Sequence, residues 1–141
     1  MSRTLELASD PASPDVVAAA LRKALPEARL HRIPKHPGRQ AIVLGLMATR
    51  LERRYPYTEL ELNEELTAGL AHFRADVDHV TCRRYLVDLG FLKRDRAGNR
   101  YFLNFPKLEA TLSIDAQEQA EELIAAALAA ATDRLTNRRA P

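Results

Sequence analysis

Apolar residues recur at the three- and four-residue spacing of amphipathic helices through most of the chain. Ser13 followed by Pro14 is a typical helix start, because the serine side chain accepts from a backbone amide and proline fits the first helical position. Thr58 and Glu61 have the spacing of a capping box, and Gly69 and Gly90 are natural helix stops. The pattern predicts five helices, at about 13–25, 39–54, 59–68, 77–89 and 115–136.

Two segments have the composition of β-structure. Residues 28–33 are interpreted as a short strand that ends before Pro34. Residues 92–105 predict a β-hairpin with its turn around Gly98, because Tyr101 and Leu103 alternate with their neighbours so that one face is buried.

The order helix, extended piece, helix, helix and hairpin is that of a winged helix-turn-helix. We therefore predict a mainly α protein with a small β-hairpin, in which a winged helix-turn-helix core is flanked by N- and C-terminal helices. The predicted organisation is a flexible tail over 1–12, one domain over 13–136 with its core at 30–105 and extra helices at 13–25 and 115–136, and a tail over 137–141.

The charge is distributed unevenly. The whole chain has a net charge of only +2, which excludes a protein that is basic throughout, but residues 83–100 hold six basic and two acidic residues. Helix 77–89 would enter the major groove of duplex DNA and hairpin 92–105 would reach the phosphates, as in a transcriptional regulator. The residues expected at DNA are Thr81, Arg83, Arg84, Lys93, Arg94, Arg96 and Arg100.

The angular positions on helix 77–89 separate a core face from an outer face. Cys82 and Leu86 point inward, whereas Thr81 and Arg84 point outward. Arg84 is also four residues before Asp88, so it has two open roles, contacting a base or pairing with that carboxylate.

Two stretches, YPYTELELNEEL at Tyr55–Leu66 and CRRYLVDLGFLKRDRAGNRYF at Cys82–Phe102, together with Asp76 between them, carry a resemblance. Over about residues 30–105 the chain resembles a bacterial domain-of-unknown-function family, number 2087. The resemblance implies winged-helix character and an association with helix-turn-helix transcriptional regulators. The helices predicted before and after this region are additions to the family pattern.

The polar residues of that pattern have structural roles available. Glu61 and Asp76 can act as caps, and the others can form a buried polar network with Arg83 or Arg84 that fixes two helices together. If Glu59 or Asn63 instead faces an open cleft near the arginines, a small anionic or polar ligand becomes the alternative. The predicted structural network is Tyr57, Glu59, Glu61, Asn63 and Asp76.

No common catalytic or nucleotide-binding motif occurs in the sequence, so we expect neither enzymatic activity nor a cofactor. His72, Asp76, His79 and Cys82 have a spacing that a metal site can use. Cys82 lies on the predicted core face, where a lone cysteine usually behaves as a small apolar residue, so no metal is expected.

The alanine-rich C-terminal helix permits close helix approach, either to helix 13–25 of the same chain or to a second copy in a homodimer. A winged-helix adaptor that binds protein and not DNA is the alternative function. A single cysteine, no apolar run long enough for a membrane and no secretory signal pattern lead us to expect a cytoplasmic protein.

Overall fold

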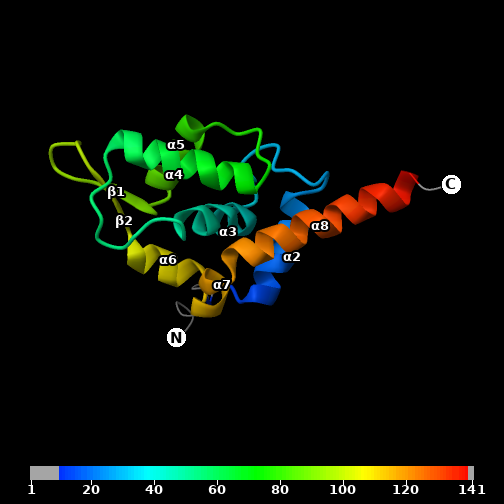
Figure 1. Ribbon diagram of the computed structural model, residues 1–141. Coiled ribbons are helices and arrows are strands. Elements are labelled where there is room, and N and C mark those ends of the chain that lie inside the picture. Colours follow the sequence, from blue (N-terminus) through cyan, green and yellow to red (C-terminus); the bar gives the residue numbers. More distant parts are fainter. Residues whose placement is uncertain (1–9, 140–141) are drawn as a thin grey trace.

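The computed structural model describes residues 10–139 and is mainly helical with one small antiparallel hairpin, as predicted (Figure 1). Within that range the elements are α2 (Pro14–Ala24), α3 (Pro37–Ala48), α4 (Glu59–His72), α5 (His79–Asp88), β1 (Leu92–Arg94), β2 (Tyr101–Leu103), α6 (Phe105–Thr111), α7 (Ile114–Glu118) and α8 (Ala120–Arg139).

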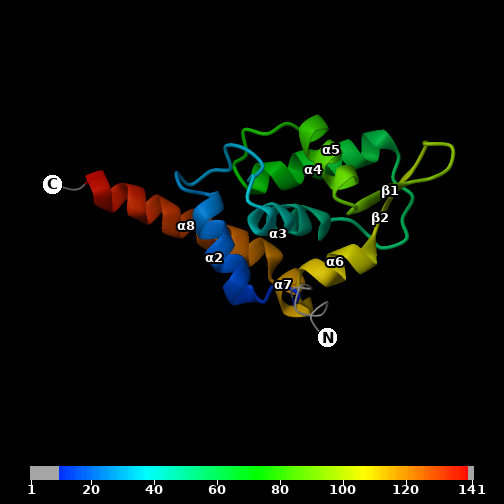
Figure 2. The same cartoon turned by 180° about the vertical axis from the view of Figure 1, so that it is seen from behind.

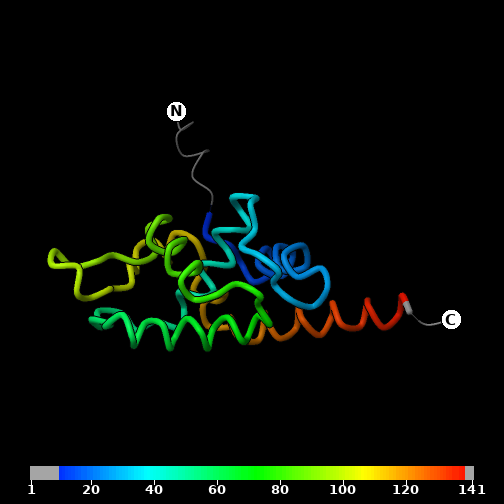
Figure 3. Tube along the Cα trace, turned by 90° about the horizontal axis from the view of Figure 1, so that it is seen from above, coloured from blue at the N-terminus to red at the C-terminus, as the bar shows by residue number. Residues whose placement is uncertain are grey.

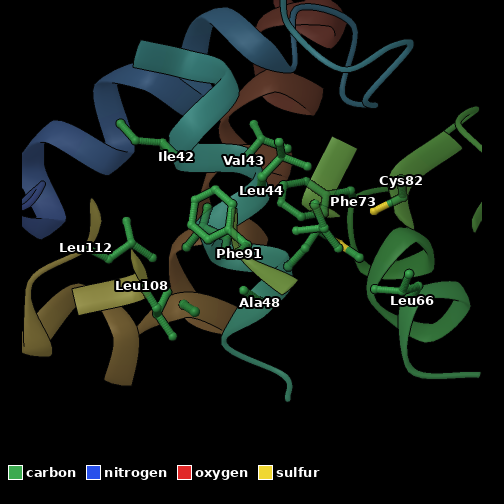
Figure 4. Close-up of a cluster of buried hydrophobic side chains, with 14 of the residues drawn as sticks. Ile42, Val43, Leu44, Ala48, Leu66, Phe73, Cys82, Phe91, Leu108 and Leu112 are labelled. Atoms are coloured by element: carbon green, nitrogen blue, oxygen red, sulfur yellow. The ribbon is translucent and has the colours of Figure 1, made fainter. Parts of the chain in front are cut away.

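Helix α3 is the centre of the core. Every residue from Ile42 to Ala48 is buried, because α2, α4, α5 and α6 all pack around it. Figure 4 shows Phe91, from the start of the hairpin, pointing into the space beside α3, with Leu108 and Leu112 on one side and Phe73 on the other. The buried side chains form one continuous cluster that includes both terminal helices.

The helix starts predicted from local capping are confirmed. The Ser13 hydroxyl accepts from the Val16 N–H, and the Thr58–Glu61 capping box has both of its hydrogen bonds. The fourth helix, α5, is capped by Asp78 and not by Asp76, since the Asp78 carboxylate accepts from the Thr81 N–H at 2.8 Å. His36 caps α3 through its ring nitrogen Nδ1, which the sequence pattern did not indicate.

The second helix is shorter than predicted and ends at Ala48 instead of about residue 54. The Thr49 hydroxyl donates to the Leu46 carbonyl, and the Glu52 N–H donates to the Tyr57 hydroxyl at 2.7 Å. Arg54 has a φ of 68°, which no helix continues through. These local bonds satisfy the backbone in a loop, although the apolar spacing alone continues the helical pattern.

Gly69 lies inside α4 and does not end it, so the predicted stop is wrong. The helix continues to His72. A Cβ at Gly69 would lie 2.8 Å from the Met47 Cε atom and 2.7 Å from the Arg50 Cδ atom. The glycine therefore permits α4 to approach α3 closely.

Residues 28–33 form no strand, contrary to the prediction. Leu30 instead bonds through its backbone to the segment between α4 and α5: its N–H donates to the Phe73 carbonyl, and the Asp76 N–H donates to the Leu30 carbonyl. The extended residue that joins the hairpin is Tyr57, which exchanges two backbone hydrogen bonds of 2.9 Å with Tyr101. The sequence of elements is thus α3, Tyr57, α4, α5, β1 and β2.

The predicted C-terminal helix at 115–136 is divided into two helices, α7 and α8, and a further helix, α6, precedes them. Phe105, which was assigned to the hairpin, begins α6, and α7 begins at Ile114 with Ser113 as its N-cap. Helix α8 then extends to Arg139, into the predicted C-terminal tail. None of the described helices has the length and apolar character that a bilayer span requires.

Helix α8 packs against α2 of the same chain, which is one of the two arrangements left open by the sequence. Ala12, at the end of the predicted N-terminal tail, is buried and bridges to Leu112; residues 1–9 lie outside the described range.

The hairpin tip and the C-terminal end of α8 lie at opposite ends of the molecule, as the rear view and the view from above also show (Figures 2 and 3).

Candidate nucleic-acid interface

The α4–α5 pair and the hairpin after it are joined by a short, well-bonded turn. Gly90 has a φ of 87°, a conformation that glycine adopts without strain. Its N–H donates to the Val87 carbonyl, and the Phe91 N–H donates to the Leu86 carbonyl, so α5 ends in one turn and β1 begins at once. The hairpin therefore has a fixed position beside α5.

The two faces of α5 agree with the angular prediction. Cys82 and Leu86 are fully buried, whereas Arg84 and Asp88 are exposed and Thr81 is half-buried. Arg84 forms no ion pair with Asp88 or with any other described carboxylate. Its side chain is therefore available to a partner.

Arg83 is held inside the helix pair. Its Nη1 atom donates to the Asn63 side-chain oxygen on α4 at 2.6 Å, and both side chains are half-buried. This contact ties α5 to α4. Of the seven residues predicted at DNA, Arg83 is held by a side chain of another helix, whereas Arg100 donates only to the carbonyl of the neighbouring Asn99 at 3.1 Å.

The hairpin tip uses its only carboxylate to form the turn. The Asp95 side chain accepts from the Asn99 N–H at 2.7 Å, and the Gly98 N–H donates to the Asp95 carbonyl. Gly98 has a φ of 74°, which closes the tip. Because this carboxylate is engaged with the backbone, it forms no ion pair with the neighbouring basic side chains.

Four exposed cations surround that tip. Lys93 and Arg94 come from β1, Arg96 from the turn and Arg100 from the residue before β2. The Arg94 guanidinium lies over the Tyr101 ring, 5.1 Å from its centroid, which orients it without neutralising it. Within residues 10–139 no carboxylate lies within ion-pair distance of any of the four. With Arg84 they form the basic surface, by which we mean Arg84, Lys93, Arg94, Arg96 and Arg100.

The first turns of α4 next to this surface are acidic. Glu61 accepts from the Thr58 N–H at 2.9 Å and from the Tyr55 hydroxyl at 2.8 Å. These hydrogen bonds, the backbone one first, lower the pKa of Glu61, and the positive charge of Arg100 contributes a smaller effect in the same direction. The hydrogen bond to Glu61 raises the pKa of Tyr55. A duplex on the basic surface must therefore avoid the α4 N-terminus.

The five residues of the predicted structural network do not form one network. Tyr57 bonds to the Glu52 backbone, Glu61 completes the capping box, and Asn63 holds Arg83. Glu59 is exposed. Asp76, in the connection between α4 and α5, pairs with Arg29 and His31 from the segment that follows α2. The residues act separately: Tyr57 is buried before α4, Asp76 lies after α4, and Glu59, Glu61 and Asn63 on α4 are exposed or half-buried and bond to different partners or to none.

The Asp76 contacts were not found from the sequence. His31 lies between two carboxylates, with Nδ1 3.0 Å from Asp76 Oδ2 and Nε2 2.8 Å from Glu27 Oε1. Glu27 and His31 are four residues apart, but this spacing lies in a non-helical segment where the helical pairing rule gives no signal. The group fastens residues 27–31 to the turn before α5.

The side chains that suggested a metal site do not meet. No group of three or more described His, Cys, Asp or Glu side chains has an arrangement that holds a metal ion. Burial raises the pKa of the Cys82 thiol to about 12, so the thiolate that a metal needs is strongly disfavoured. This agrees with the prediction that Cys82 is a core residue.

These observations define a mainly helical domain in which a capped helix pair is followed by a basic hairpin. The chain belongs to the family described as "Uncharacterized protein conserved in bacteria (DUF2087)", whose model matches residues 29–103, or 75 of the 141 residues. The match confirms the resemblance carried by the Tyr55–Leu66 and Cys82–Phe102 motifs. It contains α3 to β2 completely, whereas α2 and α6–α8 lie outside it. No curated protein and no solved structure matches the chain.

Proposed function

We propose that this domain binds duplex DNA as part of a transcriptional regulator, with α5 and the hairpin toward the duplex. One observation carries the proposal: the basic surface has five cations that no described carboxylate pairs with, on a helix and hairpin whose order is that of a winged helix-turn-helix. Unpaired, exposed cations on a protruding tip suit phosphate contacts, since they release counterions without first breaking internal ion pairs.

The composition of α5 favours backbone contacts over base reading. Thr81 is half-buried and Arg83 is bonded to Asn63, so Arg84 is the main polar side chain left to reach a base edge. Asp88, exposed on the same helix, repels phosphate. In the proposed binding mode, most of the affinity for DNA comes from the hairpin, and this affinity depends strongly on the salt concentration.

Fluorescence titration of a labelled random duplex at several salt concentrations tests the proposal. The wild-type protein should bind, with log Kd rising linearly with log salt concentration. The Arg94→Gln/Arg96→Gln variant should lower the slope by about 1.8, since each phosphate contact contributes about 0.9. The matched control is Arg22→Gln/Arg138→Gln, which removes two exposed charges from α2 and α8. Absence of binding, or equal slopes for the two variants, would refute DNA binding through the hairpin.

A protein-binding adaptor is the second candidate, and the α4 N-terminus favours it. Leu60 is 69% exposed there, beside Glu59 and Glu64. An exposed leucine among acidic residues suits a partner protein with an apolar and basic surface, and it opposes DNA. If the duplex titration is negative, a Leu60→Ser variant that fails to capture partners of the wild-type protein would support the adaptor.

A further inference from the structure

A second basic region lies between the end of α2 and the start of α3. It is a cleft of about 330 Å³, lined by Lys23, Arg32, Lys35 and Arg39 together with His31 and His36. Pro26 and Pro34 form part of its wall. In the front and rear views the chain between α2 and α3 lies toward α8, whereas the hairpin projects from the other end of the molecule (Figures 1 and 2). The cleft is therefore separate from the basic surface.

The cleft contains no negative charge of its own. No acidic residue lines it, and none of its lysines and arginines pairs with a described carboxylate. The two carboxylates beside His31 are already engaged: Glu27 with His31, and Asp76 with His31 and Arg29. Four converging cations without counter-charges repel one another, and a bound anion would relieve this repulsion.

The N-terminus of α3 adds positive potential at the same place. Helix α3 is 12 residues long and has no acidic residue in its first turn. Its first amide protons are directed at the cleft-lining His36, whose Nδ1 accepts from Gly38 and Arg39. The helix dipole and the four side chains therefore favour the same sign of ligand charge.

We propose that this cleft binds a phosphate-bearing small molecule, with Arg32 and Arg39 as forked donors and Lys23 and Lys35 as point charges. Guanidinium groups match the oxygen geometry of phosphate, and two arginines with two lysines can balance two or more negative charges. The volume lies at the lower end of the range for small-ligand sites. The proposal does not depend on DNA binding by the hairpin.

Isothermal titration with sodium pyrophosphate tests the site, with sodium chloride at equal ionic strength as the blank. The wild-type protein should bind one pyrophosphate per chain. Lys35→Gln/Arg39→Gln should weaken that binding at least about tenfold, the effect of losing one to two charge-assisted hydrogen bonds. Arg22→Gln/Arg138→Gln, with the same change in net charge, should bind as the wild type does. Circular dichroism melts establish that each variant is folded.

Two results would overturn the proposal. The first is a pyrophosphate titration that gives no heat above the chloride blank, or one in which both double variants weaken pyrophosphate binding equally. Equal weakening would mean that general charge attraction, and not the cleft, holds the anion. The second comes from duplex titration of the same proteins. If Lys35→Gln/Arg39→Gln reduces DNA affinity as much as Arg94→Gln/Arg96→Gln does, the cleft belongs to a DNA surface and not to a small-ligand site. A negative duplex titration combined with tight pyrophosphate binding would refute the proposed function and leave the cleft proposal standing.

Discussion

Replacing Arg83 by glutamine should loosen α5 from α4 without changing the basic surface. In the wild type Nη1 of Arg83 donates to the Asn63 side chain at 2.6 Å, a short bond between half-buried groups. Hydrogen bonds to a charged group contribute about 1.5–3 kcal/mol. Because both groups retain some water, we expect the lower end, and a loss of about 1.5 kcal/mol in the free energy of unfolding.

The adjacent Arg84 supplies the matched control. It is exposed and unpaired among the described residues, so Arg84→Gln should change the free energy of unfolding by less than about 0.5 kcal/mol. On the proposed function it should weaken duplex binding, whereas Arg83→Gln should weaken it only through the loosened helix. Urea unfolding followed by circular dichroism measures the stability of both variants.

A double-mutant cycle separates the bond from other effects of the substitution. Asn63→Ala and Arg83→Gln should each destabilise the protein, and together they should cost less than their sum, with a coupling energy of about 1 kcal/mol. A coupling energy below about 0.3 kcal/mol would mean that the two residues act independently. The assignment of Arg83 to the helix pair would then be refuted, and its role at DNA would return.

Three further outcomes are expected. Thr58→Ala should cost about 1 kcal/mol of stability, as loss of an N-cap usually does, and a change within error in urea unfolding would contradict the capping role. Hydrogen bonds lower the pKa of Glu61 in the folded state, so the contribution of Glu61 to stability is complete above the ordinary glutamate pKa of about 4.3 and is lost as the pH falls through the lowered folded pKa. Glu61→Gln should therefore flatten that part of a pH–stability curve. An unchanged curve would contradict hydrogen bonding as the cause of the lowered pKa. Cys82 should resist a thiol reagent such as DTNB at pH 8 until urea unfolds the chain, since burial raises its pKa to about 12, whereas rapid stoichiometric labelling of the folded protein would show that the thiol is accessible.

Parts of the fold that depend on neighbouring residues in the chain were predictable. Ser13, Thr58 and Asp78 cap helices with their own side chains, within three residues of the amide that they bind. Gly90 and Gly98 take positive φ values at the turns where the pattern placed them. The burial of Cys82 and Leu86 follows from helical spacing alone.

Parts that depend on contacts distant in sequence were not predictable. The Tyr57–Tyr101 bridge and the Leu30 bonds to Phe73 and Asp76 join segments more than forty residues apart. The end of α3 at Ala48 reflects the loop bonds that replace helical ones, and Gly69 is inside α4 because α3 approaches it there. Local pattern cannot show that a backbone group has found a partner elsewhere.

The same division holds for the candidate sites. The cations of the hairpin could be listed from the sequence, but only the tertiary structure showed that the Asp95 carboxylate is used in the turn and that Arg83 is used by Asn63. The cleft at Lys23, Arg32, Lys35 and Arg39 was missed, because its members are spread over seventeen residues, in two helices and the segment between them. By itself, the sequence determined the four helices before the hairpin in outline, the hairpin, the family and the sign of the local charge, since these depend on spacing and residue type. Which charges remain available to a ligand was decided by the tertiary structure, because a charge is free only when the folded chain brings no counter-charge or acceptor to it.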